Sequence, residues 1–386
     1  MTGDVSRGVR RCGAVLALVL ACAAAGCSPT AEPSSPGSAR APAGSTTETP
    51  TPTPTPATTP TTTVSAPREP RPGPVEIAVA GDVHFEGTLA ARLLRPAAAL
   101  TPATPALAAA DVAIVNLETS VGSGGRPEPG KRFVFSAGAA AFEALAAAGI
   151  DVASMANNHA LDLGRARLPS TLRAAAAARP ELSVVGLGAD EDGAFAPAVT
   201  DVDGTRVATI AASAADQDPT ADPTGAWAAG PNTPGVADAN DPRRLLREVR
   251  RADVEADVVV TYLHWGVQGE RCPSSDQRSL ARRLVGAGAD VVVGSHAHEL
   301  QGDGRLGPGY VAYGLGNFAW YAPGPAGVLT LTVQPPREPA GRARVTASRW
   351  WPATIGADGL ASPDSGAAAA ASRDRRTALR ECAGLR

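Results

Sequence analysis

The chain is poor in aromatic residues, in lysine and in cysteine. Aromatic residues make up 4% of its 386 positions, and Lys131 is the only lysine. Basic charge is therefore carried almost entirely by arginine, and the formal net charge is −3. Nucleic-acid-binding domains usually show a basic stripe or patch, so the composition argues against a nucleic-acid partner.

Long apolar runs are also scarce, and the one exception lies near the N-terminus. Residues 14–25 are almost entirely Ala, Val and Leu, they follow three arginines, and they lead into Ala-Ala-Gly-Cys at residues 24–27. A basic start, a short apolar core and small residues define a secretory signal. Because a cysteine after small residues resembles a bacterial lipobox, we predict a lipoprotein signal peptide over residues 1–26 and lipidation of Cys27. Secretion without a lipid is the alternative.

Residues 28–74 lack the large apolar side chains that a folded core needs. They are rich in Pro, Thr, Ser and Ala, and Thr and Pro alternate over residues 49–56. Such a segment cannot bury a core, and Pro-rich linkers are extended. We therefore predict that residues 27–74 are a lipidated cysteine and a stalk that holds a folded domain away from a membrane. A tail without function is the alternative.

The five cysteines fit an oxidising compartment. Cleavage before Cys27 removes Cys12 and Cys22, and lipidation takes up Cys27 itself. Cys272 and Cys382 remain as an even pair, which in a secreted protein favours a disulfide. We predict that this bond joins the C-terminal tail to the loop after His264, with two free thiols as the alternative.

The pattern becomes globular at residue 75, where short apolar runs alternate with helical stretches. The strands expected are 75–81, 111–118, 132–136, 152–156, 182–187, 207–212, 257–263, 291–295, 311–314, 328–333 and 344–350, and the helices 88–95, 139–148, 165–178, 243–252 and 275–287. Alternating elements predict an α/β fold, with an antiparallel part where the last two strands follow each other. We assign residues 75–355 to one domain and residues 356–386 to a C-terminal tail, which is peripheral unless Cys382 ties it to the domain.

All five histidines lie at or just beyond the end of an expected strand. They are His84, His159, His264, His296 and His298. Ligands of open α/β sheets bind outside the carboxyl ends of the strands. A single histidine is more often structural than a ligand, but five in this position indicate a metal or catalytic centre.

Carboxylates and amides accompany these histidines. Asp82 precedes His84 by two residues, so both side chains point the same way from an extended backbone. Glu118 ends the second strand and Asn158 precedes His159, while His296 and His298 are again two apart. Carboxylate, amide and imidazole ligands without thiolates suit Mn, Fe or Zn.

The order of these motifs resembles the metallophosphoesterase (calcineurin-like) superfamily and, more closely, the CapA family of poly-γ-glutamate capsule biosynthesis. The strings that carry the resemblance run from about residue 75 to 318. They are Gly81-Asp82, Asn116-Leu117-Glu118, Asn157-Asn158-His159 with Asp162 and Gly164, His264-Trp265-Gly266 with Glu270, Gly294-x-His296-x-His298 with Gln301, and Tyr313-Gly314-Leu315-Gly316-Asn317-Phe318. Each string alone is weak evidence, but six in this order are specific.

The resemblance implies a four-layer α/β/β/α sandwich with mixed sheets and a site for two divalent metal ions, each Mn, Fe or Zn. The implied ligands are Asp82, His84 and His298 for one ion and Asn158, His264 and His296 for the other, with Glu118 as the bridge. His159 is then the general acid or a donor to the transition state. Asp162 either orients His159 or caps the helix that begins near Gly164.

Five further residues are weaker candidates for contact with the substrate. Lys131 and Arg132 could bind an anionic group, as could Arg271, although solvated charge is the usual alternative. Trp265 could line a pocket or pack in the core. Asn317 belongs to the last motif of the resemblance, without an assigned role.

We expect an extracytoplasmic, membrane-anchored, metal-dependent hydrolase or transferase. Its expected substrate is an anionic envelope polymer such as poly-γ-glutamate, or a phosphoester, and capsule-synthesis membrane proteins are expected partners. The alternatives are a secreted phosphoesterase and a non-catalytic subunit that binds or assembles the polymer.

Overall fold

The structure is a computed structural model that describes residues 73–336, 338 and 341–385. The predicted signal peptide, the linker and the lipidation site Cys27 lie outside the described residues. Within the described part, no helix is both long and apolar enough to cross a membrane.

One mixed sheet has eight strands in the order β18-β17-β16-β1-β2-β5-β6, with β15 also paired to β1. Its parallel part consists of β1 (Val75–Val83), β2 (Val112–Leu117), β5 (Val152–Ser154), β6 (Ser183–Val185) and β15 (Asn317–Ala319). Its antiparallel part consists of β16 (Gly324–Gln334), β17 (Arg344–Ile355) and β18 (Ala361–Pro363).

The second mixed sheet has six strands in the order β13-β14-β12-β11-β9-β8. Its parallel strands are β9 (Thr205–Ser213), β11 (Val258–Trp265), β12 (Val291–His296) and β14 (Gly309–Ala312), and its antiparallel strands are β8 (Ala198–Val202) and β13 (Asp303–Leu306). Two short pairs, β3 (Ser120–Val121) with β4 (Ser136–Ala137) and β7 (Leu187–Gly188) with β10 (Gly235–Val236), lie outside both sheets.

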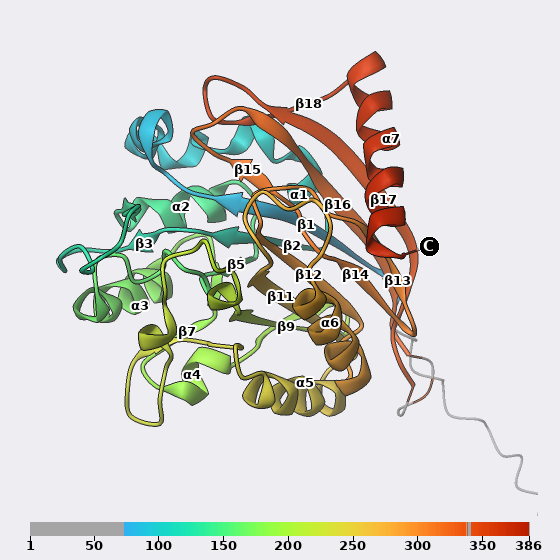
Figure 1. Ribbon diagram of the computed structural model, residues 1–386, viewed down its shortest axis with the longest axis horizontal. Helices are drawn as coiled ribbons and strands as arrows, with labels where there is room; N and C mark the ends of the chain where they lie inside the picture. The colour runs from blue at the N-terminus through green and yellow to red at the C-terminus, as the bar shows by residue number, and fades with distance from the viewer. Residues whose placement is uncertain (1–72, 337, 339–340, 386) are drawn as a thin grey trace, which may run out of the picture. The chain divides into compact units, whose positions relative to one another are not determined.

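Helices cover the outer faces of the two sheets (Figure 1). Helices α1 (Pro105–Ala108), α2 (Ala140–Ala147) and α3 (Leu168–Ala177) lie on the side of the eight-stranded sheet, and α4 (Glu191–Phe195), α5 (Arg243–Glu255) and α6 (Ser275–Ala287) on the side of the six-stranded sheet. Short 3₁₀ helices occupy Gly87–Leu94, Pro96–Ala98, Thr101–Ala103, Arg165–Arg167, Ala215–Gln217 and Gly225–Trp227.

Strand β11 shows how the sequence produces these layers. Successive side chains of a strand point to opposite faces. Val258, Val260 and Tyr262 belong to the core shared with the eight-stranded sheet, whereas Val259, Leu263 and Trp265 pack in a second core with α5 and α6. Both faces are apolar because both are covered, and the four-layer α/β/β/α fold with mixed sheets is confirmed.

One expectation about a strand is wrong. Residues 132–135 are not a strand, because the chain bends at residues 132 and 133 and the Phe135 N–H donates to Asp162 Oδ2 at 2.7 Å. Only the two-residue strand β4 follows. The C-terminal tail follows the second of the two expected cases, because Cys382 ties it to the domain through a disulfide. It forms β18 and the 18-residue helix α7 (Gly366–Ala383).

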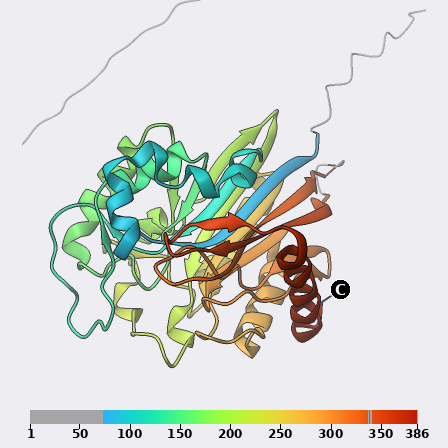
Figure 2. The same cartoon turned by 90° about the horizontal axis from the view of Figure 1, so that it is seen from above.

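Helix α7 packs against β13 and β17, and so joins the margins of the two sheets (Figure 2). Asp303 on β13 is 5% exposed and accepts hydrogen bonds from Arg376 Nε at 2.6 Å and from Arg380 Nη2 at 3.1 Å. At the end of the helix, Cys382 forms a disulfide with Cys272, and their Cα atoms lie 5.6 Å apart. The same helix end is thereby tied to the loop that follows β11.

Removing the Asp303 carboxylate should destabilise the domain. Asp303→Ala leaves two arginines without their shared partner, and breaking a buried ion pair on one side costs about 3–5 kcal/mol. Because Arg376 and Arg380 are partly exposed, we expect the free energy of unfolding to fall by the lower value, about 3 kcal/mol. Urea unfolding measures this change. The matched control is Asp374→Ala, since Asp374 is an exposed aspartate of α7, the helix that carries Arg376 and Arg380. Equal unfolding free energies for the two variants would contradict the role given to α7.

Candidate metal centre

The carboxyl ends of five parallel strands and their loops meet at one place. Asp82 on β1 pairs in register with Asn116 on β2, which pairs with Ser154 on β5. In the other sheet, β11 ends with His264 and Trp265 beside Ser295 and His296 of β12. Because β1 and β12 are in contact across the interface between the sheets, polar strand ends from both sheets face one another.

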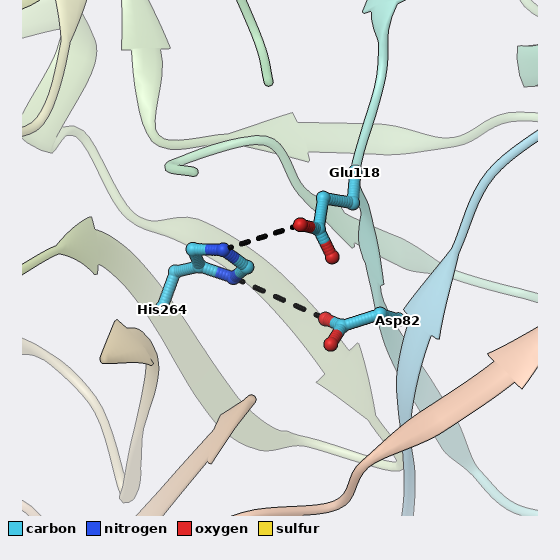
Figure 3. Close-up of side chains that lie close together, drawn as sticks. All are labelled: Asp82, Glu118 and His264. Atoms are coloured by element: carbon cyan, nitrogen blue, oxygen red, sulfur yellow. Dashed lines mark ion pairs between the residues drawn. The ribbon is translucent and has the colours of Figure 1, made fainter. Parts of the chain in front are cut away.

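Asp82, Glu118 and His264 form the centre of this cluster (Figure 3). His264 Nε2 lies 3.6 Å from Glu118 Oε1, and His264 Nδ1 lies 3.9 Å from Asp82 Oδ1. All three side chains are completely buried. Asn116 Nδ2 donates to Asp82 Oδ1 at 2.8 Å, which holds that carboxylate in place.

Glu118 is the least compensated group of the cluster. Neither of its carboxylate oxygens accepts a hydrogen bond from any described residue, although both are buried. Burial raises the pKa of Glu118 well above its usual range, and the charge of Asp82 raises it further. A buried carboxylate is stable only when it is paired or binds a metal, so this arrangement fits cations held between its oxygens and the surrounding histidines.

One set of ligand atoms has the spacing of a metal site. His264 Nε2 lies 2.7 Å from Asn158 Oδ1, 3.1 Å from His296 Nδ1 and 3.6 Å from Glu118 Oε1. Nitrogen and oxygen ligands bind zinc at about 2.0–2.2 Å, so that neighbours in a tetrahedral site are about 3.4 Å apart. These four residues would hold one ion.

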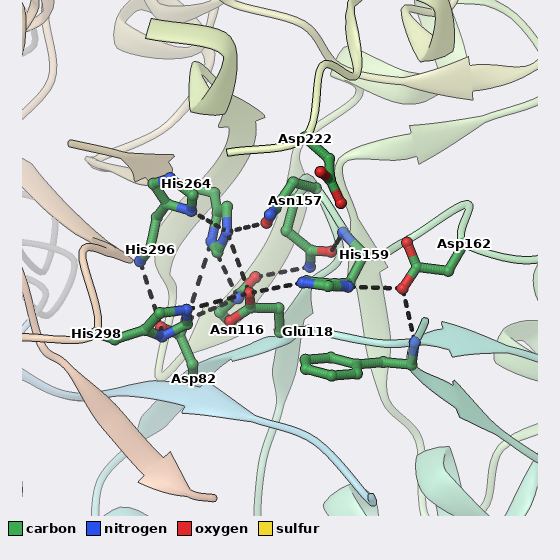
Figure 4. A network of polar contacts seen from close by, with 12 residues as sticks. Asp82, Asn116, Glu118, Asn157, His159, Asp162, Asp222, His264, His296 and His298 are labelled. Carbon is green, nitrogen blue, oxygen red and sulfur yellow. Dashed lines mark hydrogen bonds and ion pairs between the residues drawn. The ribbon is translucent and has the colours of Figure 1, made fainter. Parts of the chain in front are cut away.

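The second set lies on the Asp82 side. His298 Nδ1 is 3.4 Å from Asp82 Oδ2, and His298 Nε2 is 3.9 Å from Glu118 Oε1. Asp82, Glu118 and His298 would hold a second ion, with Glu118 shared between the two sets (Figure 4).

His84 does not join these groups, contrary to the expected ligand set. Its Nδ1 accepts a hydrogen bond from the Glu86 N–H at 2.9 Å, and its Nε2 faces the Tyr321 N–H at 3.3 Å. The rings of Trp320 and Tyr321 pack on it with centroids 4.1 and 4.8 Å away. The simple alternation of side chains fails because the strand register shifts directly after Asp82. Burial and the nearby His159 lower the pKa of His84 to about 3.

The other buried histidines are also kept neutral. Burial is the main cause that lowers the pKa of His264, His296 and His159, and neighbouring histidines add to the effect. Because the neutral imidazole is the form that binds metals, the burial of the cluster favours ligation.

His159 lies beside the two ligand sets, and Asp162 contacts the ring nitrogen that points away from them. His159 Nδ1 is 2.6 Å from Asp162 Oδ2, and its Nε2 is 3.8 Å from Glu118 Oε1. The Phe135 ring stacks on it with centroids 4.0 Å apart. Asp162 also pairs with Lys131 Nζ at 3.1 Å. Neither the 3₁₀ helix Arg165–Arg167 nor α3 has a side-chain cap, so Asp162 orients His159 and does not serve as a helix cap.

The backbone is strained at the two histidines of the His-x-His motif. His296 has φ 97° and His298 has φ 55°, a region that few residues other than glycine adopt. Gly81 makes a close approach, since a Cβ there would lie 1.8 Å from the carbonyl oxygen of Gly316. Such strain persists only where surrounding contacts enforce it, and it is concentrated at functional sites.

The weaker candidates for substrate contact lie in different environments. Trp265 is completely buried and donates to the Tyr313 carbonyl at 2.8 Å, so it is a core residue and not a pocket wall. Arg132 is exposed at the rim and paired with Asp222 at 2.7 Å. Lys131 is buried behind His159, and Asn317 Oδ1 lies 2.8 Å from His298 Nδ1, where it orients that ring.

Several site residues were not singled out from the sequence. Asn116 and Asn157 lie inside recognised motifs, and Asn157 Nδ2 donates to Asn116 Oδ1 at 3.0 Å. Asp218 contacts His296 Nε2 at 3.2 Å, but it lies in an acid-rich loop where no spacing distinguishes it from its neighbours. Phe135 was assigned to an expected strand, and nothing in the sequence indicated that its ring stacks on His159.

The chain is similar to known capsule proteins. The family model "Bacterial capsule synthesis protein PGA_cap" matches residues 76–321. The chain is 35% identical over 171 residues to the PGA biosynthesis protein CapA of Bacillus subtilis, which covers 44% of this chain and 42% of that protein. It is 34% identical over 186 residues to the capsule biosynthesis protein CapA of Bacillus anthracis. This aligned segment covers 46% of this chain and 42% of that protein.

These matches span less than half the length of the two relatives. Among solved structures, a phosphatase of Mycoplasma pneumoniae aligns with a TM-score of 0.44 and 13% identity, covering 73% of this chain and 94% of that one. The family model covers the segment from the start of β1 to Tyr321 and hence all the residues of the two ligand sets. On this match, the chain belongs to the bacterial capsule synthesis protein (PGA_cap) family.

Proposed function

We propose that the chain is a metal-dependent enzyme, a hydrolase or transferase, that acts on poly-γ-glutamate or another anionic polymer of the cell envelope. The observation that carries the proposal is the Glu118 carboxylate, which is buried without a hydrogen-bond donor among the described residues. Asn158, His264 and His296 lie on one side of it, and Asp82 and His298 on the other. Two cations beside Glu118 would compensate the charge of this buried carboxylate.

The ligand sets define what the residues of the chain would do. Two divalent ions held by these residues, each Mn, Fe or Zn, would supply a nucleophilic water and would stabilise charge on the oxygens of the bond that breaks. Asn116 fixes the Asp82 carboxylate by its hydrogen bond of 2.8 Å. Asp82, Glu118 and His264 are completely buried, and this burial strengthens the electrostatic interactions among them.

His159 is placed to move a proton. The Asp162 carboxylate only accepts hydrogen bonds, so the contact of 2.6 Å holds a proton on His159 Nδ1. The lone pair is then on Nε2, which faces Glu118 and the ligand sets. Nε2 can take up a proton and deliver it to a leaving group, while Asp162 stabilises the imidazolium formed.

The substrate class follows from the family and remains part of the proposal. The two Bacillus relatives are named for poly-γ-glutamate and capsule biosynthesis. Arg271 is exposed and pairs at 3.2 Å with Glu299, the residue that follows His298, and we propose that its guanidinium binds a carboxylate of the polymer. The bond attacked is a γ-glutamyl amide or a phosphoester, and capsule-synthesis membrane proteins are the proposed partners.

Two variants should separate metal binding from proton transfer. Glu118→Gln should lose bound metal and activity together, because the bridging carboxylate is gone. His159→Asn should keep about two ions per chain and lose activity by about 100- to 10,000-fold, the usual contribution of a general acid or base. The measurements are elemental analysis and the cleavage rates of poly-γ-glutamate and of a chromogenic phosphoester.

Glu255→Gln at the exposed end of α5 is the matched control and should change neither quantity. A wild-type chain that takes up no Mn, Fe or Zn would overturn the enzyme proposal and favour a non-catalytic polymer-binding subunit. Turnover of the phosphoester alone would favour a secreted phosphoesterase.

We also propose an extracytoplasmic location, with the domain tethered to the membrane by a lipid on Cys27. The support is the basic, apolar and small-residue order of residues 7–27 and the Pro/Thr-rich stretch after it. Cys27→Ser removes the thiol that would carry the lipid, so most of the protein should move from the membrane to the soluble fraction. An unchanged membrane fraction would contradict the tether.

A further inference from the structure

The two histidines of the His-x-His motif have different neighbours at their ring nitrogens. His296 Nε2 contacts Asp218 Oδ2 at 3.2 Å, and His296 Nδ1 faces His264 Nε2 at 3.1 Å. His298 is the reverse, because its Nδ1 contacts Asn317 Oδ1 at 2.8 Å and its Nε2 faces Glu118. The pair therefore turns opposite ring nitrogens toward the two ligand sets.

The neighbours decide which nitrogen can bind a metal. A neutral imidazole carries one proton, and only the other nitrogen has a free lone pair. A carboxylate such as Asp218 accepts but does not donate, so it holds the proton of His296 on Nε2 and leaves Nδ1 free. For His298, Asn317 Oδ1 and Asp82 Oδ2 both lie on the Nδ1 side, which leaves Nε2 free.

We propose that Asp218 is a positioning residue that fixes His296 as an Nδ1 metal ligand, with Asn317 fixing His298 as an Nε2 ligand. Partners of this kind orient metal-binding histidines and select their tautomer. The assignment rests on the proposed metal centre and extends it to the loop after β9, which carries none of the sequence motifs.

Asp218 is built into its place more firmly than a surface aspartate. It is 3% exposed, and its carboxylate accepts hydrogen bonds from Thr220 N and Thr220 Oγ1, both at 2.7 Å, and from Gln268 N at 2.9 Å. Its three donors come from the loop after β9 and the loop after β11. The carboxylate therefore has a fixed orientation before it meets His296.

The positive φ of His296 shows why such a partner is needed. At φ 97° the backbone of this residue is unfavourable, and neighbouring contacts must hold the ring in its direction. Asp218 Oδ2 provides one contact, and the His296 N–H donates to Asp82 Oδ2 at 3.3 Å. Without Asp218, the imidazole loses the group that sets both its tautomer and its rotation.

The test compares Asp218→Asn with Asp216→Asn in the full chain. Asp216 lies in the same loop and accepts from Thr224 N and Thr224 Oγ1, each at 2.7 Å, without contacting a histidine. Zn²⁺ and Mn²⁺ affinities are measured by chelator competition, and the unfolding midpoints of the metal-free proteins show whether the fold is kept. Asp218→Asn should lower the affinity for one of the two ions by about 10- to 100-fold, the usual effect of losing such a partner. Asp216→Asn should lower the affinity for neither ion.

A second measurement does not depend on any variant. The chain has five histidines, so a spectrum of the ¹⁵N-histidine-labelled metal-free protein contains few ring signals. We expect His296 as the Nε2–H tautomer and His298 as the Nδ1–H tautomer. The opposite tautomer at His296, or wild-type affinity for both ions in Asp218→Asn, would overturn the assignment. Failure of the wild type to bind metal would instead sink the proposed function, while the tautomers would still be read.

Discussion

The rest of the site depends on the burial of the Glu118 carboxylate. An ionised carboxylate without donors or cations is very unfavourable inside a protein, and here both oxygens lack a donor among the described residues. The same burial keeps the surrounding histidines neutral and able to donate lone pairs. A single requirement, positive charge beside Glu118, therefore explains the composition of the cluster.

The two sheets provide the rigidity that this arrangement requires. The ligands come from strand ends in both sheets, so packing between the sheets sets the distances between them. Strain at His296 and His298 is tolerated because Asp82, Asp218 and Asn317 hold these residues from several sides. Helix α7 and its disulfide connect the sheet margins with the loop after β11, whose Gln268 N–H in turn fixes Asp218.

Periodicity was sufficient to predict an α/β fold and most strands, and strand-end chemistry predicted the convergence of the histidines. The four layers were predicted by the family resemblance and not by periodicity. Periodicity and strand-end chemistry failed where local geometry or distant contacts decide. A register shift after Asp82 turns His84 toward backbone amides, and no sequence pattern reveals such a shift. For Trp265 the sequence left a pocket wall and core packing open, and alternation along β11 places it in the core with α5 and α6. The partner of His296 comes from a loop 78 residues away in sequence, which only the fold brings close.

Anomalous X-ray scattering from crystals grown with Mn²⁺ or Zn²⁺ tests the central claim most directly. The account predicts two peaks about 3.5–4 Å apart, with the Glu118 carboxylate between them and its oxygens about 2.0–2.2 Å from the ions. One peak should lie against His296 Nδ1 and the other against His298 Nε2. A Glu118 carboxylate that has no ion beside it at saturating metal, and is hydrogen-bonded to water instead, would contradict the account.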